Sequence, residues 1–301
     1  MNNIIFWLNC ARAYSLPMST TAWLIPFVYG ITHNGNMLYG MIALIGIYAA
    51  HLGGNLFDDY LDYKRYLKNE KTVPLQKGKC NYLIEGRATQ KDLLLAVIVY
   101  FGTAILIGGF FVYIYKLPII IIMAVTGVLC LIYPRSSYYG LGEVIIGTIF
   151  APLLFCGVYY VMTQMYSMTL MLLSLPFAII TITLLYVHSF MDFNYDKMDC
   201  KQTLCTLSKT KENAYNLLIF MIFLAYFYIF ALVSLKFLPL AYIVVCTTLY
   251  WAAKLCKTVQ KYINAEPESE EEFLQIFSKA QKLPVIFALF LILSCLIDYL
   301  L

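Results

Sequence analysis

Charged residues are scarce in this chain. Asp, Glu, Lys and Arg make up 13% of its 301 residues, whereas soluble domains carry about 25%. Hydrophobic residues make up 61%, and the mean hydropathy is +0.74. No polar segment is long enough to fold alone as a soluble domain. The composition therefore excludes a soluble globular protein and predicts an all-α, polytopic membrane protein, because helices satisfy their own backbone groups in lipid.

Paired cysteine motifs are also missing. The nine cysteines are scattered and include no Cys-x-x-Cys pair, so we expect buried thiols and no disulfide framework. Cys200 and Cys205 lie close enough in sequence to be weighed as metal ligands, but buried thiols are the simpler interpretation. The N-terminus has no basic stretch leading into a short apolar core, so no cleavable signal peptide is expected. A net charge of only +4 gives no indication of a nucleic-acid partner.

Long apolar runs are abundant. A spanning helix needs about 20 mainly apolar residues, and the sequence contains nine such candidates. They are 17–33, 38–57, 92–115, 117–133, 141–162, 168–190, 214–235, 237–255 and 281–300. Pro17, Pro118 and Pro239 lie near helix starts, where a missing N–H does little harm, whereas Pro26, Pro152 and Pro176 should kink their helices. We expect one membrane-embedded domain that covers residues 1–301.

The basic residues are distributed unevenly between the two ends of these spans. Of the 21 Lys and Arg residues, all except Lys116 and Lys236 fall on one side, which the positive-inside rule identifies as the cytoplasm. We expect a location in the inner (plasma) membrane of a bacterium. The acidic run from Glu266 to Glu272 is on the cytoplasmic side and is most simply a solvated loop.

Aspartates gather at two points where an apolar run ends on the cytoplasmic side. The first motif runs from Asn55 to Asp62 (Asn-Leu-Phe-Asp-Asp-Tyr-Leu-Asp), and the second runs from His188 to Asp199, with its aspartates at 192, 196 and 199. Unpaired carboxylates at a membrane boundary are costly. A metal, a proton path or an ion path would account for them, and two clusters at matched positions favour a divalent metal with an anion held between them.

The spacing of the aspartates supports a metal. If the helix continues through the first motif, Asp58 and Asp59 lie one turn before Asp62, and Asn55 lies one turn before Asp59. Asp192, Asp196 and Asp199 follow the same helical spacing. Hard oxygen ligands with few His or Cys among them suit Mg²⁺, which takes one or two carboxylates and completes its shell with water and phosphate. Two such clusters can hold a diphosphate, and the apolar spans beneath them suit a long hydrocarbon tail.

Basic residues follow both motifs. Lys77, Lys79 and Arg87 follow the first, and Lys197 and Lys201 follow the second. For Lys64, Lys68 and Lys71 the positive-inside rule is sufficient explanation. For Arg87 and Lys201 both explanations, the positive-inside rule and binding of the anion, stay open at this point. The alternative for the aspartates themselves is that they form merely solvated helix ends.

Several strings resemble the UbiA superfamily of intramembrane prenyltransferases. Ala11 to Pro17 resembles its Arg-Pro-x-(Thr/Ser)-Leu-Pro string, and Asn55 to Asp62 resembles its Asn-x-x-Asn-Asp-Tyr-x-Asp motif. Ile84 to Thr89 resembles its Ser-Gly-Arg stretch. Asp192-x-x-x-Asp196, followed by Lys201-Gln202-Thr203-Leu204, resembles its second acidic motif. Tyr138 to Glu143 resembles a Tyr-Arg-Gly-Leu-Gly-Glu signature of the branch that prenylates 1,4-dihydroxy-2-naphthoate in menaquinone biosynthesis.

The resemblance implies a fold, a reaction and a set of site residues. The fold would be a UbiA-like helical bundle. A polyprenyl diphosphate would lose its diphosphate with the help of Mg²⁺, and the allylic carbocation would attack an aromatic acceptor. The implied metal ligands are Asp58, Asp59, Asp62, Asp192 and Asp196, and all of these except Asp58 are also expected to be catalytic. The implied substrate-binding residues are Arg12, Asn55, Arg87, Tyr139 and Lys201.

The chain departs from the family pattern at several positions. Asp58 stands for Asn, Tyr139 for Arg, and Cys200 for Gly. His188 stands where the naphthoate branch often has Asn, and Tyr66 stands where many members have Asp. These changes leave the diphosphate chemistry intact and bear on the acceptor. The acceptors considered are therefore 1,4-dihydroxy-2-naphthoate first, then 4-hydroxybenzoate, homogentisate or haem.

Two other classes of protein were weighed. An ion-coupled transporter would place its carboxylates near the middle of the membrane in broken helices, whereas these clusters fall at cytoplasmic helix ends. A CDP-alcohol phosphotransferase would need a single Asp-Gly…Ala-Arg…Gly…Asp…Asp string, which this sequence does not contain.

Overall fold

A computed structural model describes residues 4–68, 80–267 and 269–301. These residues are helical apart from turns and one isolated bridge between Tyr139 and Gln202, so the all-α prediction is confirmed. The chain divides into two compact units, one formed by Met1–Thr20 with Met41–Ala124 and the other by Thr21–Gly40 with Val125–Leu301. A single domain over residues 1–301 stays a prediction.

Eight helical spans within the described residues are long and apolar enough to cross a membrane. They are α3 (Met37–Lys68), α5 (Gln90–Tyr115), α6 (Leu117–Ser136), Gly142–Thr163, α9 (Met168–Met191), α12 (Lys211–Ser234), Leu240–Gln260 and the greater part of α14 (Glu270–Leu300). The remaining predicted span is α2 (Leu16–Thr32), whose 17 residues fall short of the usual length of about 20. The prediction of about nine membrane helices is confirmed in its essentials, and the protein is an integral membrane protein.

The prolines act largely as expected. Pro17 and Pro118 lie in the first turns of α2 and α6, and Pro239 caps the N-terminus of η3 (Leu240–Thr248). Pro152 lies in a π-helical segment, η2 (Ile149–Leu153), between α7 (Gly142–Thr148) and α8 (Leu154–Thr163). A wider turn at this point fits a residue that has no N–H to donate and whose ring crowds the preceding turn.

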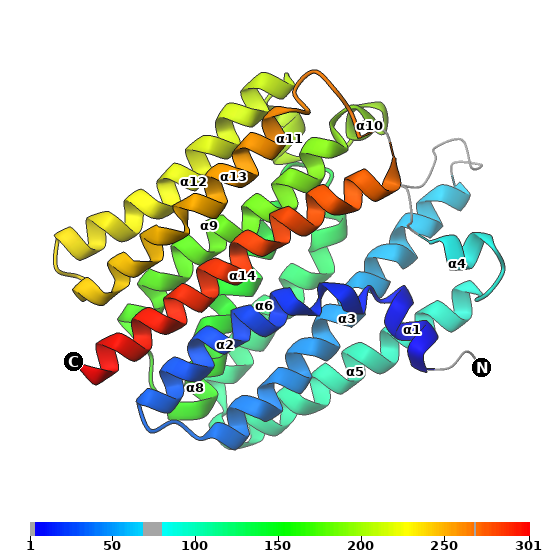
Figure 1. Ribbon diagram of the computed structural model, residues 1–301. Coiled ribbons are helices and arrows are strands. Elements are labelled where there is room, and N and C mark those ends of the chain that lie inside the picture. The colour runs from blue at the N-terminus through cyan, green and yellow to red at the C-terminus, as the bar shows by residue number, and fades with distance from the viewer. Residues whose placement is uncertain (1–3, 69–79, 268) are drawn as a thin grey trace. The chain divides into compact units, whose positions relative to one another are not determined.

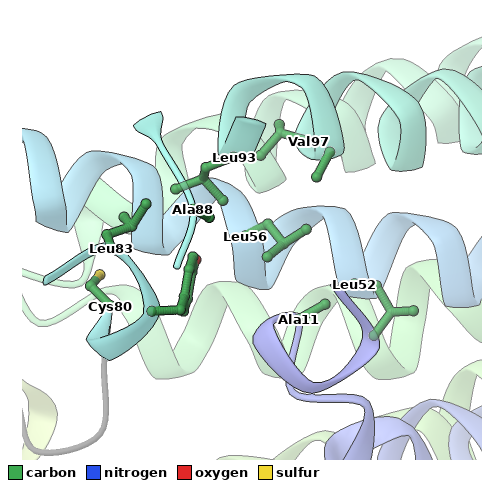
Figure 2. Close-up of a cluster of buried hydrophobic side chains, with 10 residues drawn as sticks. Ala11, Leu52, Leu56, Cys80, Leu83, Ala88, Leu93 and Val97 are labelled. Carbon is green, nitrogen blue, oxygen red and sulfur yellow. The ribbon is translucent and has the colours of Figure 1, made fainter. Parts of the chain in front are cut away.

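The first unit is built on α3 and α5, which share a hydrophobic core. Leu52 and Leu56 of α3 pack with Leu93 and Val97 of α5 (Figure 2). The segment between the two helices contains α4 (Asn81–Ile84) and supplies Tyr82 and Leu83 to the same core. The N-terminal segment, α1 (Ile4–Cys10) and η1 (Ala13–Ser15), adds Ala11. Burial of these side chains stabilises the unit by about 25 cal/mol per Å² of apolar surface removed from water. The same packing fixes the N-terminal segment beside the first acidic motif.

The second unit is centred on α9. Its apolar window is 67% buried, more than that of any other span, and it packs against α7, α12 and α14. Figure 1 shows α12 in yellow, α13 (Leu249–Gln260) in orange and α14 in red running alongside α9. Gly147 permits the close approach of α7, since a Cβ there would lie 2.7 Å from Ile182 of α9. By contrast, only 17% and 11% of the apolar windows of α5 and α6 are buried, so most of their side chains are available to contact lipid.

Some predicted residues lie outside the described part of the chain. Lys71, Lys77 and Lys79 fall between residues 68 and 80, and Glu268 is also among the undescribed residues.

Candidate active site

The first acidic motif lies on a continuous helix. Helix α3 runs through the whole motif and ends at Lys68, so Asn55, Asp59 and Asp62 occupy consecutive turns, as their spacing predicted. Asp59 is only 2% exposed and Asp58 is 9% exposed, while Asp62 is half-buried. The motif is therefore not simply a solvated helix end, because a buried carboxylate needs partners.

Arg12 is the main charged partner of the buried aspartates. Its Nη2 lies 2.6 Å from Oδ1 of Asp59 and 3.7 Å from Oδ2 of Asp58. The same nitrogen donates to the carbonyl of Asn55 at 2.9 Å. Arg12 has a left-handed backbone conformation, with φ of 59°, which costs a residue with a side chain roughly 1–2 kcal/mol. Because the charged contact is largely buried, losing one partner would cost about 3–5 kcal/mol, enough to hold this strained turn.

Tyr82 completes the surroundings of Asp59. Its hydroxyl donates to Oδ2 of Asp59 at 3.1 Å, and Cys80 contacts the Asp59 carbonyl at 3.4 Å. Burial, with the charge of Asp59 as a second cause, raises the pKa of Tyr82 above its usual range. The phenol therefore stays protonated and able to donate. No motif in the sequence singles out Tyr82, since only the fold brings α4 beside α3.

Asn55 connects the N-terminal segment to α3. Its amide donates to the Ala11 carbonyl at 2.9 Å and to Oγ of Ser15 at 3.3 Å. Oγ of Ser15 also lies 3.1 Å from Nε2 of His51, one turn earlier on α3. These contacts fix the turn that presents Arg12, so the predicted substrate-binding residues Arg12 and Asn55 are brought together.

Arg87 differs from the rest of this group because it is exposed. Its side chain is 58% exposed and lies 2.8 Å from Oε2 of Glu85. Burial and the charge of Asp59 raise the pKa of the Cys10 thiol to about 11, and the charge of Arg87 opposes the shift. The Arg87–Glu85 pair lies at the surface, where such a pair contributes only about 0–1 kcal/mol.

The second motif lies on its own short helix. α9 ends at Met191, and Asp192, with φ of −90° and ψ of 11°, caps both α9 and α10 (Phe193–Met198). The N–H of Asp196 donates to the Asp192 carbonyl at 2.8 Å, so the predicted helical spacing of these two residues is present on α10. Asp199 follows as the C-cap of α10.

Asp196 is the buried carboxylate of this motif. It is 2% exposed, and its Oδ1 lies 3.6 Å from Nζ of Lys201. Burial raises the pKa of Asp196 to about 6; the positive charge of Lys201 opposes the shift and the charge of Asp192 reinforces it. Desolvation outweighs the ion pair here, so the site gains from a further cation.

A bridge joins the Tyr138–Glu143 segment to the second motif. Tyr139 pairs with Gln202 in an isolated parallel bridge, and the Gln202 N–H donates to the Tyr138 carbonyl at 3.3 Å. Nζ of Lys201 also lies 5.8 Å from the centre of the Tyr138 ring. The Tyr139 side chain itself is exposed. Two strings that are far apart in sequence therefore form one local structure in the second unit.

Glu143 is a buried carboxylate that the sequence did not single out. It is 5% exposed, and its Oε1 accepts from Oγ of Ser189 on α9 at 3.2 Å. Its other oxygen is buried without a hydrogen-bond partner in the described structure. The only sequence signal was its position at the end of Gly140-Leu141-Gly142-Glu143.

The donor atoms of the two motifs fit Mg²⁺. All are oxygens of Asp or Asn, the ligands that hard cations prefer. Within the described residues, no three His, Cys, Asp or Glu side chains are placed to hold a metal by themselves. This agrees with Mg²⁺, which commonly takes one or two carboxylates and relies on water and substrate phosphate for the rest.

Comparison with known proteins identifies the class. The model of the UbiA prenyltransferase family matches residues 17–269, which contain both acidic motifs. The chain therefore belongs to the UbiA prenyltransferase family. A search of curated proteins finds no match.

Solved structures show the same fold. A UbiA homolog from Archaeoglobus fulgidus bound to GPP and Mg²⁺ has a TM-score of 0.64 and 14% identity, over 95% of this chain and 99% of that one. A UbiA homolog from Aeropyrum pernix K1 has a TM-score of 0.63 and 13% identity, over 93% and 98%. A digeranylgeranylglyceryl phosphate synthase has a TM-score of 0.63 and 14% identity, over 96% and 97%. At these identities the likeness establishes the fold.

Proposed function

We propose that this protein transfers a polyprenyl group from a polyprenyl diphosphate to an aromatic acceptor, with Mg²⁺ as cofactor and 1,4-dihydroxy-2-naphthoate as the acceptor. The observation that supports this best is that each unit holds a buried aspartate beside a basic side chain. Asp59 lies 2.6 Å from Arg12, and Asp196 lies 3.6 Å from Lys201. The carboxylates suit a metal cation, and the neighbouring basic side chains suit the diphosphate anion. Together they suit a diphosphate bound with its metal.

The proposed roles follow from burial and charge. Asp58, Asp59, Asp62, Asp192 and Asp196 hold the metal. Bound Mg²⁺ supplies charge stabilisation for the departing diphosphate. Arg12, Arg87 and Lys201 neutralise the diphosphate, and such preorganised charge in a poor dielectric is typically the largest contribution to rate. Tyr82 and Asn55 keep Asp59 and Arg12 oriented. The A. fulgidus homolog bound to GPP and Mg²⁺ supports this assignment of donor and metal.

The bond changes conserve electrons and atoms. The C–O bond of the allylic diphosphate breaks, and its electron pair leaves with the diphosphate. A ring carbon of the acceptor supplies the electron pair of the new C–C bond. With 1,4-dihydroxy-2-naphthoate the attacking carbon is the one that bears the carboxylate; its bond to the carboxylate carbon then breaks, CO₂ leaves, and the electron pair of that bond returns to the ring, which regains aromaticity. The resemblance of Tyr138 to Glu143 to the naphthoate branch is the support for this acceptor.

The test is a product assay. Membranes that contain the protein are incubated with Mg²⁺, a polyprenyl diphosphate and 1,4-dihydroxy-2-naphthoate, 4-hydroxybenzoate or homogentisate, and lipid products are identified by mass. We expect prenylated naphthol from the first acid, no product after EDTA treatment, and recovery on addition of Mg²⁺. A mainly prenylated hydroxybenzoate in direct competition would refute the acceptor, and full turnover in EDTA would refute the metal.

A further inference from the structure

His188 is a side chain that the proposed reaction leaves without a role. It lies on the last turn of α9, and its Nδ1 is 3.2 Å from Oδ2 of Asp192. The Asp192 N–H also donates to the His188 carbonyl at 3.1 Å. The ring is therefore anchored to the second acidic motif by its own helix turn.

The imidazole of His188 also contacts two phenyl rings of α14. The ring of His188 meets Phe273 edge-on at 5.2 Å between centroids and Phe277 at 5.5 Å, with interplanar angles of 90° and 87°. Phe273 and Phe277 are one helical turn apart, so both belong to one face of α14. All three rings are only partly buried, and the His188 side chain is 36% exposed. The three rings thus form a partly open aromatic surface one turn from Asp192.

The contact with Asp192 determines what the other ring nitrogen does. An ionised carboxylate only accepts hydrogen bonds, so Nδ1 carries the proton in this pair. In the neutral ring Nε2 is then an acceptor. Among the described residues, Nε2 makes no hydrogen bond, since Asp192 is bound through Nδ1 and the other contacts of the ring are with phenyl groups.

We propose that His188, Phe273 and Phe277 form the subsite for the aromatic acceptor, in which Nε2 of His188 accepts a hydrogen bond from a ring hydroxyl. The subsite takes a hydroxylated aromatic acid: the phenyl groups contact the ring, and the imidazole selects the hydroxyl. It rests on the proposed function, because the donor diphosphate bound at Asp192 would then lie one helical turn away.

A competing interpretation is that His188 only orients Asp192, as an outer partner of a metal ligand would. The two interpretations differ in which substrate is affected. If His188 only orients Asp192, its removal weakens the binding of Mg²⁺ and the prenyl donor. If His188 contacts the acceptor, its removal weakens acceptor binding and leaves the donor KM nearly unchanged.

The experiment measures binding and turnover in four forms of the full-length protein: wild type, His188→Phe, Phe277→Ala and His33→Phe. His188→Phe keeps an aromatic ring against α14 and removes both nitrogens. His33→Phe is the matched control, since His33 likewise stacks on an aromatic ring, that of Tyr29 at 4.2 Å. Equilibrium dialysis with 1-hydroxy-2-naphthoate and its O-methyl ether measures acceptor binding without any donor, and steady-state assays give KM for each substrate.

We expect His188→Phe to weaken binding of the hydroxy acid by about tenfold, the loss of one hydrogen bond of about 1.4 kcal/mol, and to bind the methyl ether as wild type does. Phe277→Ala should weaken both ligands, and His33→Phe neither. The donor KM should change less than about threefold.

Unchanged acceptor binding with a raised donor KM overturns the subsite. If His188→Phe is not recovered as monodisperse protein, Phe277→Ala decides: equal acceptor binding to wild type overturns the subsite. Acceptor binding without prenylated product in the wild type would refute the proposed function and leave the subsite standing.

Discussion

At the scale of single residues, the protein combines buried carboxylates with few compensating charges. Asp59 and Asp196 are each 2% exposed, and each has a basic side chain within ion-pair distance, Arg12 and Lys201 respectively. Both positions are costly for the folded chain without a further cation. An unfavourable burial energy of this kind is expected where carboxylates are arranged to hold a metal ion and an anion.

The first prediction concerns the role of these carboxylates. Asp59→Asn and Asp192→Asn should each lower turnover at least about a hundredfold, because each removes preorganised charge stabilisation. The amide keeps the size of the side chain, and in Asp59→Asn its single oxygen can accept from only one of Arg12 and Tyr82, which donate to different carboxylate oxygens. Asp298→Asn, in the last turn of α14, is the control and should leave turnover unchanged. Full activity in either variant at normal expression would mean that the motif in question is only structural.

The second prediction follows from the pKa of Asp196, which burial raises to about 6 from about 4 in the unfolded chain. The folded protein then binds this proton more tightly than the unfolded chain. In EDTA, the contribution of Asp196 to stability is greatest below about pH 4 and falls as pH rises to about 6, by up to about 3 kcal/mol.

Thermal unfolding of the purified protein in EDTA between about pH 4 and pH 7 measures this dependence. Asp196→Asn should remove the Asp196 part of the slope, and Asp92→Asn, which alters an exposed helix cap, should retain it. Identical slopes in the wild type and Asp196→Asn would contradict the raised pKa.

A third prediction concerns Cys200, which follows α10. Its φ of 54° lies in the left-handed region, which favours Gly. Cys200→Gly should raise the free energy of unfolding by roughly 1 kcal/mol, because Gly adopts this conformation without the steric cost of a Cβ. Cys200→Ala is the control and should bring no gain. A lower melting temperature for Cys200→Gly would show that the side chain contributes more than the strain costs.

At the scale of elements, the segments that connect the spanning helices arrange the surroundings of Lys201. The bridge between Tyr139 and Gln202 joins the segment before α7 to the segment after α10, and Gly140 makes the turn possible with φ of 76°. A Cβ at Gly140 would also lie 2.6 Å from Leu207 of α11 (Leu204–Leu207). The local arrangement around Lys201 therefore depends on a glycine in the neighbouring segment.

Gly140→Ala tests this dependence. The substitution adds both a strained φ and a collision with Leu207, so it should destabilise the protein by more than about 1 kcal/mol and raise the KM for the prenyl donor. Gly86→Ala is the matched control, since Gly86 has a similar φ of 69° but open space around its Cβ position. Equal effects of the two substitutions on stability would show that backbone strain alone acts at Gly140.

At the scale of the whole molecule, the main prediction is orientation. The sequence predicts that all but two (Lys116 and Lys236) of the 21 Lys and Arg residues fall on the side that carries the acidic motifs, so both motifs should face the cytoplasm. Cys200 is an exposed native thiol beside the second motif. A membrane-impermeant maleimide should label it in inverted membrane vesicles and not in intact cells.

Two added cysteines extend this test in a Cys200→Ser background. Lys68→Cys, at the exposed end of α3 next to the first motif, should be labelled in inverted vesicles, and Gln164→Cys, in the exposed turn after α8, should be labelled in intact cells. Labelling of Lys68→Cys from the outside would refute the orientation for the first motif. The unsubstituted Cys200→Ser protein controls for the remaining cysteines.

The sequence alone predicted the helical membrane class, the positions of the spans and both acidic motifs. It did so because the signals are local: apolar length defines a span, and carboxylates at a membrane boundary stand out against apolar neighbours. The continuation of α3 through Asp62, which the spacing of the aspartates anticipated, was likewise a local property. The same local signals placed Pro17, Pro118 and Pro239 at helix starts.

Only the tertiary structure decided which side chains complete each motif. Tyr82 reaches Asp59 because α4 packs against α3, and Glu143 meets Ser189 because Gly147 lets α7 approach α9. The aromatic surface at His188 exists because α14 lies beside α9. Contacts between residues far apart in the chain depend on how helices pack, and packing depends on shape complementarity that leaves no local signal in one sequence. The motifs were therefore readable from the sequence, whereas the partners that orient them were not.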